Sequence, residues 1–144
     1  MTEPSSSADL HIHTHYSDGT LSPQQVVGEA ISRGLSCISI TDHDTVDGVR
    51  PTQQAAEKFS LEVVSGIELS SEWQGKDIHV LGYFVNFFHG ILKKKLDEIQ
   101  ETRLTRIQEM IRKLKEQGID NISFEEVCRL SESKAVGRPH LAFV

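Results

Sequence analysis

Three histidines fall within five residues near the start of the chain, in the stretch "ADLHIHTHYSDGT" (residues 8–20). The whole chain has only seven histidines, so this clustering needs a chemical explanation. An acidic residue, Asp18, follows the cluster closely. Imidazole nitrogens and carboxylate oxygens are common ligands of divalent transition metals. The stretch therefore predicts that His11, His13 and Asp18 bind metal.

Further candidate ligands follow later apolar segments. His43 comes after the run "LSCISI", Glu68 lies near the end of "LEVVSGIEL", and His79 lies within "DIHVLGYF". Any one of these residues could instead be an ordinary hydrogen-bonded side chain, but their joint pattern favours a metal cluster. A ligand set of nitrogen and oxygen without cysteine favours Mn, Fe, Zn or Co over Ca or a cysteine-type structural zinc. We expect two or three divalent ions, with Mn favoured and Zn or Fe as alternatives, which can activate a water and hold a phosphoryl group.

These residues need a scaffold that brings them together. Short apolar or alternating runs predict strands at residues 8–13, 35–41, 61–69 and 77–84. Helices are predicted from Pro23 to Gly34, from residue 49 to 59, and from residue 91 to 117, where Gly118 ends the last one. Strands that alternate with helices over short connections predict an α/β fold of parallel β/α units. The chemistry of such folds gathers at the carboxyl ends of the strands.

Two helix starts carry a capping signature. Ser22 precedes Pro23 and is followed three residues later by Gln25, which predicts a capping box with proline at the first helical position. Ser123 and Glu126 have the same spacing and predict a second capping box. A final segment, "VGRPHLAFV" (residues 136–144), is expected to begin a helix or turn.

Composition and charge restrict the class of protein. The chain has 144 residues, of which 38% are apolar and 25% charged, as in a soluble globular protein. The formal net charge of −6 argues against general affinity for nucleic acid, although bound cations would still permit a phosphate ligand. Two cysteines make no disulfide framework, and no apolar run is long enough to span a membrane. We expect a cytoplasmic protein whose residues 1–7 form a disordered tail.

The long predicted helix carries two notable arginines. Its apolar face includes Leu96, Ile107 and Ile111, and Arg103 falls inside this face, while Arg106 lies at its edge. A half-buried arginine needs an anionic partner. Two interpretations are open, namely a structural ion pair and the recognition of a substrate phosphate.

The motifs "DLHIHTHYSDG", "ITDHDT", "GIELS" and "IHVLGY" together resemble the PHP superfamily, named for polymerase and histidinol phosphatase. Within it the sequence is most similar to stand-alone metal-dependent phosphoesterases that act on nucleotides and RNA ends. The resemblance implies a distorted seven-stranded β/α barrel with a trinuclear metal site. It also implies a ligand set made of His11, His13, Asp18, His43, Glu68 and His79, with Glu68 bridging two ions.

The same resemblance suggests roles for other residues. Asp42 is expected to orient His43, and Asp44 to touch the substrate or the nucleophilic water. The segment "GRPH", with Arg138 and His140, resembles a family segment that contacts substrate phosphate. Arg103 and Arg106 join the expected substrate-binding set because of their positions on the long helix and not through the resemblance.

The chain is short for such a barrel, which requires on the order of 250 residues by comparison with eight-stranded barrels. The family's later ligands, a histidine in an "AHP"-like segment and an Asp-x-His pair, have no counterpart in this sequence. We therefore expect residues 8–144 to form a partial PHP barrel, truncated after about four β/α units. Such a half barrel would expose strand edges, and self-association could cover them.

The sequence thus predicts a metal-dependent phosphoesterase that hydrolyses nucleotide or oligonucleotide phosphoesters through a metal-activated water. Glu68, His43 and Asp18 are the expected catalytic residues, and a phosphorylated small molecule or a nucleic-acid end is the expected substrate. Two other interpretations stay open. One is the PHP module of a DNA polymerase, with a proofreading or structural role, and the other is a catalytically inactive metal-binding fragment. Histidinol phosphatase activity is a weaker option within the same chemistry.

Overall fold

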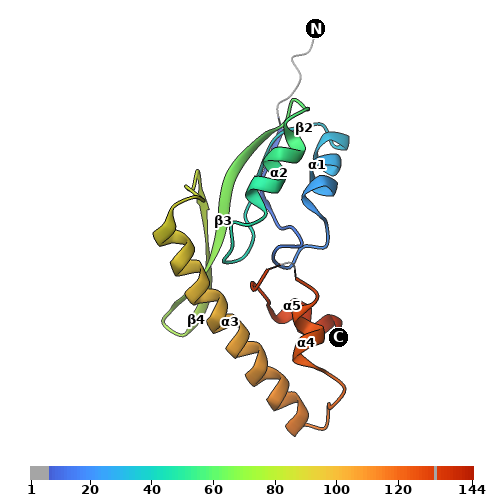
Figure 1. The fold of residues 1–144 in the computed structure, drawn as a ribbon, viewed down its shortest axis with the longest axis vertical. Helices are drawn as coiled ribbons and strands as arrows, with labels where there is room; N and C mark the ends of the chain where they lie inside the picture. Colours follow the sequence, from blue (N-terminus) through green and yellow to red (C-terminus); the bar gives the residue numbers. More distant parts are fainter. Residues whose placement is uncertain (1–6, 132) are drawn as a thin grey trace.

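The computed structural model describes residues 7–131 and 133–144 of the chain (Figure 1). In chain order the elements are β1 (Ser7–Ile12), α1 (Pro23–Ser32), β2 (Leu35–Ile40), α2 (Val49–Ala56), β3 (Glu62–Trp73), β4 (Lys76–Tyr83), α3 (Gly90–Glu116), α4 (Phe124–Cys128) and α5 (Arg138–Phe143). The tail predicted over residues 1–7 lies outside the described residues except for Ser7, which is the first residue of β1.

The strands form one curved sheet with the order β1-β2-β3-β4 in the described part of the chain (Figure 1). β1 pairs with β2, and β2 with β3, in the parallel direction, and α1 and α2 provide the two crossover connections. These two β/α units confirm the predicted α/β class and the partial barrel. The carboxyl ends of three parallel strands therefore meet at one edge of the sheet.

The prediction of a parallel fourth strand is wrong, because β4 runs antiparallel to β3. β3 is longer than expected and continues to Trp73, so that only Gln74 and Gly75 connect it to β4. Both connecting residues have positive φ, at 51° and 74°, as a two-residue hairpin turn requires. A parallel strand would need a connection of a dozen residues or more, which this sequence does not provide.

The predicted helix starts are confirmed. The Ser22 side chain accepts a hydrogen bond from the Gln25 amide, the Gln25 side chain caps the Ser22 amide in return, and Pro23 opens α1. Ser123 and Glu126 form the same reciprocal pair at α4. α2 ends at Ala56, earlier than the predicted residue 59.

Two apolar clusters hold the chain together. The larger one joins α1 and α2 to the sheet and includes Val27, Ile38 and Ile40. The smaller one joins the carboxyl half of α3 to α4 and α5, with Ile107 and Val127 at its centre. The amino-terminal half of α3 contributes Leu96 to the larger cluster, so this one helix links the sheet to the helical lobe below it (Figure 1).

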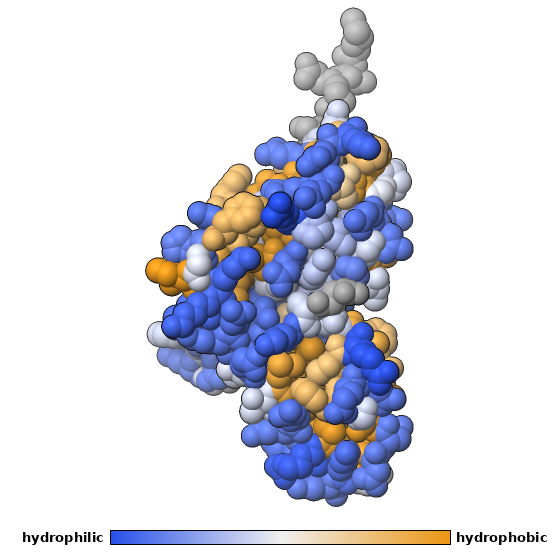
Figure 2. Space-filling view, viewed as in Figure 1, coloured by the Kyte–Doolittle hydropathy of each residue, from blue (hydrophilic) through white to orange (hydrophobic). Residues whose placement is uncertain are grey.

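The two outer strands leave the sheet open. All of β1 except Ile12 is exposed, and most of β4 is exposed as well. Apolar side chains of β4 and of the segment after it lie on the surface, among them Val80, Phe84 and Phe88. Figure 2 shows such apolar areas (orange) within a largely hydrophilic surface. Among the described residues, no helix is both long enough and apolar enough to cross a membrane.

Gly66 on β3 tests how closely the parallel strands must approach. A Cβ atom there would lie 2.4 Å from the Ser39 hydroxyl oxygen and 2.7 Å from the Ile40 carbonyl oxygen. We expect Gly66→Ala to lower the free energy of unfolding by about 1–3 kcal/mol, because neighbouring backbone must shift. Urea denaturation would measure this change.

Gly28 on α1 is the matched control, because a Cβ atom there would meet nothing within 4 Å. Gly28→Ala should leave stability unchanged or raise it by up to about 1 kcal/mol, as expected for an exposed helical glycine. Equal effects of the two substitutions would contradict the packing argument at Gly66.

Candidate metal centre and substrate cleft

The loop after β1 is held in place by a buried carboxylate. Asp42, which is 1% exposed, accepts hydrogen bonds from the Thr14 amide at 2.6 Å, the Thr14 hydroxyl at 2.7 Å and the Ser17 hydroxyl at 2.7 Å. These bonds fix the turn between His13 and Asp18. The prediction that Asp42 orients His43 is wrong, because the carboxylate is directed to this neighbouring loop instead.

Backbone pairing between the ends of β2 and β3 places His43 beside Glu68. The Glu68 amide donates to the Asp42 carbonyl at 3.2 Å, and the Asp44 amide donates to the Glu68 carbonyl at 2.9 Å. His43 and Glu68 thus form an isolated parallel bridge that continues the ladder beyond β2. Because residues paired in this way project to the same side of a sheet, both side chains lie on one face.

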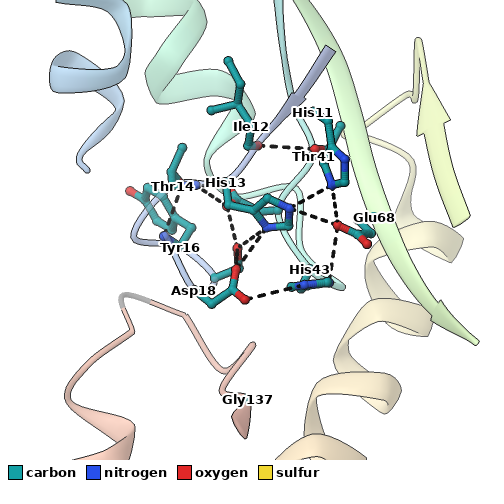
Figure 3. A network of polar contacts seen from close by, with 12 residues as sticks. His11, Ile12, His13, Thr14, Tyr16, Asp18, Thr41, His43, Glu68 and Gly137 are labelled. Carbon is teal, nitrogen blue, oxygen red and sulfur yellow. Dashed lines mark hydrogen bonds and ion pairs between the residues drawn. The ribbon is translucent and has the colours of Figure 1, made fainter. Parts of the chain in front are cut away.

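Glu68 contacts four histidines of the cluster that results, and Figure 3 shows it beside His11, His13 and His43. Its Oε2 lies 2.8 Å from His11 Nε2 and 2.9 Å from His13 Nε2, and its Oε1 lies 2.7 Å from His79 Nδ1. His43 is further away, with Nδ1 at 3.8 Å from Oε2. The strands β1, β3 and β4 and the loop after β2 each supply a side chain, although His79 comes from a strand that runs antiparallel to β3 and not from the carboxyl end of a parallel strand.

Asp18 extends the cluster on its other side. Asp18 Oδ1 lies 3.1 Å from His13 Nδ1, and Oδ2 lies 3.6 Å from His43 Nε2. The six predicted ligands therefore lie together, in three groups that could each hold a metal ion. These groups are His11, His13 and Glu68; His13, Asp18 and His43; and His43, Glu68 and His79.

The geometry of these donors suits a cation. His11 Nε2, His13 Nε2 and Glu68 Oε2 lie between 2.8 and 3.1 Å from one another. Ligands about 2.1 Å from one ion at right angles to each other would be separated by roughly 3 Å. His43 Nδ1 is buried, and no hydrogen-bond partner reaches it among the described residues. A buried ring nitrogen without a partner is costly, and a bound cation would satisfy it.

The pKa shifts of the clustered residues also suit metal binding. Burial raises the pKa of Asp18, but the His13 hydrogen bond and the charge of His43 outweigh this effect and lower the pKa to about 2. Burial opposes ionisation of Glu68 also, but hydrogen bonds from His11 and His79 with nearby histidine charges lower its pKa. Burial lowers the pKa of His43. Metal ligands must be deprotonated, and these groups are already so at neutral pH.

The pKa of His13 is raised, whereas that of His43 is lowered, and the cause of this rise also favours cation binding. Burial alone would lower the pKa of His13, but the hydrogen bond with Asp18 and the charges of Asp18 and Glu68 raise it above its ordinary value. Two carboxylates therefore attract positive charge to the point between them. A proton can supply that charge, and so can a divalent ion.

Arg103 forms a buried ion pair with Asp44. Arg103 Nε donates to Asp44 Oδ2 at 2.5 Å, and the Ser70 amide donates to Asp44 Oδ1 at 2.8 Å. A second Arg103 nitrogen, Nη2, donates to the Ser70 hydroxyl at 2.7 Å. Asp44 is fully buried, with both oxygens engaged, and its contact with the substrate or the nucleophilic water stays a prediction. Of the two interpretations of Arg103, the structure shows the ion pair.

A cleft of about 750 Å³ opens beside the cluster, and Asp18, His43 and His79 form part of its wall. α3 and α5 contribute the opposite wall, including Arg106 and Arg138. Both arginines are more than half exposed and contact Asp77 of β4. Arg103 also lines this cleft, so three of the predicted phosphate-binding residues line a space adjacent to the predicted metal ligands.

His140 has a different position from the one predicted. It is 4% exposed, its Nε2 donates to the Ser17 carbonyl at 2.7 Å, and its Nδ1 accepts from the Gly137 amide at 3.0 Å. Both ring nitrogens are thus used by the backbone, and neither is left for a substrate phosphate. His140 instead attaches α5 to the loop that carries Asp18, as the Ser133 hydroxyl does by donating to the Tyr16 carbonyl.

Several contributors were not identified from the sequence. Thr14 and Ser17 hold Asp42, Ser70 holds Arg103, and Asp77 contacts two cleft arginines. Asp77 had a usable signal, because it precedes His79 by two residues and so shares a strand face with it. The serine and threonine residues had no such sequence signal, because these residue types are common in loops whatever their role.

Comparison with known families identifies the class of protein. The profile of the PHP domain matches residues 9–104, which include all six clustered ligands. The chain belongs to the PHP domain family. This match confirms the resemblance drawn from the motifs.

The relatives include nucleic-acid and nucleotide enzymes. The chain is 33% identical over 134 residues to the 5'-3' exoribonuclease of Haemophilus influenzae, a match over 93% of this chain and 48% of that protein. It is 30% identical over 135 residues to the 3',5'-nucleoside bisphosphate phosphatase of Chromobacterium violaceum, again over 93% of this chain and 47% of that protein. The chain therefore spans about half the length of these relatives.

A solved structure shows the same fold. The structure of an amidohydrolase from Chromobacterium violaceum with bound sulfate superposes with a TM-score of 0.87 at 30% identity, over 94% of this chain and 48% of that chain. A match to the error-prone DNA polymerase of Cutibacterium acnes covers only 44% of this chain and 6% of the polymerase. The exoribonuclease and the bisphosphate phosphatase, by contrast, match over 93% of this chain.

The buried ion pair between Arg103 and Asp44 yields a stability prediction. Arg103→Met leaves a fully buried carboxylate without its cation, and we expect unfolding to become easier by about 3–5 kcal/mol. The double substitution Arg103→Met with Asp44→Asn should recover part of this loss, because the unpaired charge is removed. Asparagine tolerates the positive φ of 50° at position 44. Urea denaturation of the two variants measures both effects.

Arg112→Met provides the control, because Arg112 pairs with Glu116 on the exposed surface of the same helix. Its cost should not exceed about 1 kcal/mol. A similar small cost at Arg103 would contradict the structural role assigned to that ion pair.

Proposed function

We propose that this PHP domain is a metal-dependent phosphoesterase site that hydrolyses phosphoesters of nucleotides or oligonucleotides. Two or three divalent ions would be held by His11, His13, Asp18, His43, Glu68 and His79. Manganese is the proposed metal, with zinc or iron as alternatives, because the donors are imidazole nitrogens and carboxylate oxygens without cysteine.

One observation carries this proposal, namely the convergence of four histidines on a buried glutamate. Burying a carboxylate with several imidazoles is costly unless these groups share positive charge. Glu68 has histidine nitrogens at 2.7, 2.8 and 2.9 Å, and it is 4% exposed. Such an arrangement contributes little as ordinary core packing, whereas it is suited to holding cations.

The residues of the chain have distinct roles in the proposed reaction. Bound divalent ions would supply Lewis-acid chemistry, which activates water and neutralises charge on a phosphoryl group. Glu68 and Asp18 provide the negative charge that retains the cations, and His43 adds a neutral nitrogen donor. Arg106 and Arg138 line the same cleft, where guanidinium groups can bind phosphate oxygens through paired hydrogen bonds. Asp42 acts indirectly, by fixing the loop between His13 and Asp18.

The proposed substrate class rests on the cleft and on the relatives. The cleft wall combines metal-ligand candidates with two arginines, as a phosphorylated ligand requires. The relatives that match over 93% of this chain are named as an exoribonuclease and a nucleoside bisphosphate phosphatase, and the similar solved structure contains sulfate, which has the shape of phosphate. A nucleotide or a nucleic-acid end is therefore the substrate class that we propose.

Metal binding is the first property to measure. After dialysis against manganese, elemental analysis should find two or more ions on each purified chain. Glu68→Gln should weaken manganese binding at least tenfold, because loss of even a residue that supports a ligand costs roughly 10–100-fold. Glu62→Gln, at the opposite end of the same strand, is the control and should bind manganese normally. Equal metal content in the Glu68 and Glu62 variants would contradict the assigned role of Glu68.

Turnover tests the activity itself. With manganese present, the chain should release phosphate from adenosine 3',5'-bisphosphate, and Glu68→Gln should lower kcat by about a hundredfold. Chelation should abolish phosphate release, and manganese should restore it. Full manganese occupancy without release of phosphate from nucleotides or RNA ends would instead support the inactive metal-binding alternative.

A further inference from the structure

Asp77 occupies a distinctive position in the cleft wall. In the β3–β4 hairpin Asp77 pairs with Glu72, and His79 pairs with Ser70. Asp77 and His79 are two residues apart on one strand, so their side chains lie on the same face, with Cα atoms about 7 Å apart. Asp77 is therefore the neighbour of His79, a proposed metal ligand, on the same face of β4.

Two arginines from distant parts of the sequence converge on the Asp77 carboxylate. Arg138 Nη2 of α5 lies 3.2 Å from Asp77 Oδ2, and Arg106 Nη2 of α3 lies 3.8 Å from the same oxygen. The three side chains are between 50% and 60% exposed. Ion pairs as exposed as these contribute about 0–1 kcal/mol to stability, so a competing anion can open them.

The third arginine of the cleft shows the contrast. Arg103 is 18% exposed and pairs with a carboxylate that has no exposure at all. Arg103 is therefore fixed by the fold, while Arg106 and Arg138 are held together only by a surface carboxylate. Phosphate suits two guanidinium groups better than a carboxylate does, because it offers more charge and more acceptor oxygens.

We propose that the Asp77 carboxylate occupies the arginine site that a second substrate phosphate takes on binding, and so determines which phosphorylated substrates the cleft prefers. Without substrate, Asp77 keeps Arg106 and Arg138 together. A substrate with a second phosphate, on the same nucleoside or on the next nucleotide, displaces Asp77 from the arginines while its scissile phosphate lies at the metal cluster. A substrate with one phosphate leaves the ion pairs in place and gains no binding affinity from the two arginines. This inference rests on the proposed phosphoesterase function of the cleft.

The anion site can be tested apart from metal chemistry. In the presence of EDTA, inorganic phosphate is titrated into the full chain, and the Nε–Hε resonances of the arginines are followed by NMR. Variants Arg106→Gln and Arg138→Gln assign the two resonances. Asp77→Asn should raise the affinity for phosphate about fivefold, the fold-change expected on removing one surface charge interaction. Arg138→Gln should lower it.

Asp120→Asn is the matched control, because it removes the same charge from an exposed residue outside the cleft. It should leave the affinity for phosphate unchanged, and urea denaturation should show wild-type stability for Asp77→Asn. Equal phosphate affinities of the Asp77 variant and the wild type would overturn the inference, as would equal effects of the Asp77 and Asp120 substitutions.

A second titration, with manganese, tests the link to substrate. Measured before hydrolysis proceeds, adenosine 3',5'-bisphosphate should bind Asp77→Asn more tightly than it binds the wild type, while adenosine 5'-monophosphate should bind both equally. Equal tightening for the two nucleotides would overturn the selective role of Asp77. If manganese does not strengthen binding of either nucleotide to the wild type, the proposed function fails, and the result with EDTA still decides whether Asp77 competes with phosphate.

Discussion

The backbone pairing of Glu68 with residues 42–44 is the constraint on which the rest of the site depends. It extends the parallel ladder past the end of β2 and places the side chains of His43 and Glu68 on one face. The histidines of β1 and β4 then reach the same carboxylate from either side. A strand that ended its pairing at Ile40 would leave His43 on a free loop, and the cluster would lose its centre.

Charge accounts for most of what surrounds this pairing. Two kinds of carboxylate lie close together, and the structure treats them differently. Glu68 and Asp18 face histidines, whereas the carboxylates of Asp42 and Asp44 are engaged by hydroxyls, amides and a guanidinium. Low dielectric surroundings make an unpaired charge costly, so the buried pair must be satisfied by the fold. The proposed metal ligands and the structural acids therefore differ in the groups that surround their carboxylates.

The helical lobe gives the cleft its second wall. α3 belongs to both apolar clusters, and His140 and Ser133 attach the lobe to the loop that carries Asp18. Phosphate-binding candidates on α3 and α5 are thereby placed opposite the metal-ligand candidates. The open edges at β1 and β4 belong to the same architecture, since a chain that spans about half the length of its relatives forms half of a barrel.

The sequence by itself determined the α/β class, the helix caps at Ser22 and Ser123, and the six residues of the cluster. These follow from local patterns, because strand alternation and capping depend on residues close in sequence. Only the tertiary structure decided the antiparallel direction of β4, the structural roles of Asp42, Asp44 and His140, and the contacts of Asp77. The direction of β4 follows from its two-residue connection at Gln74 and Gly75, once β3 is found to continue to Trp73. The other features depend on which partner lies across space, at separations of up to 123 residues, and no local pattern specifies that partner.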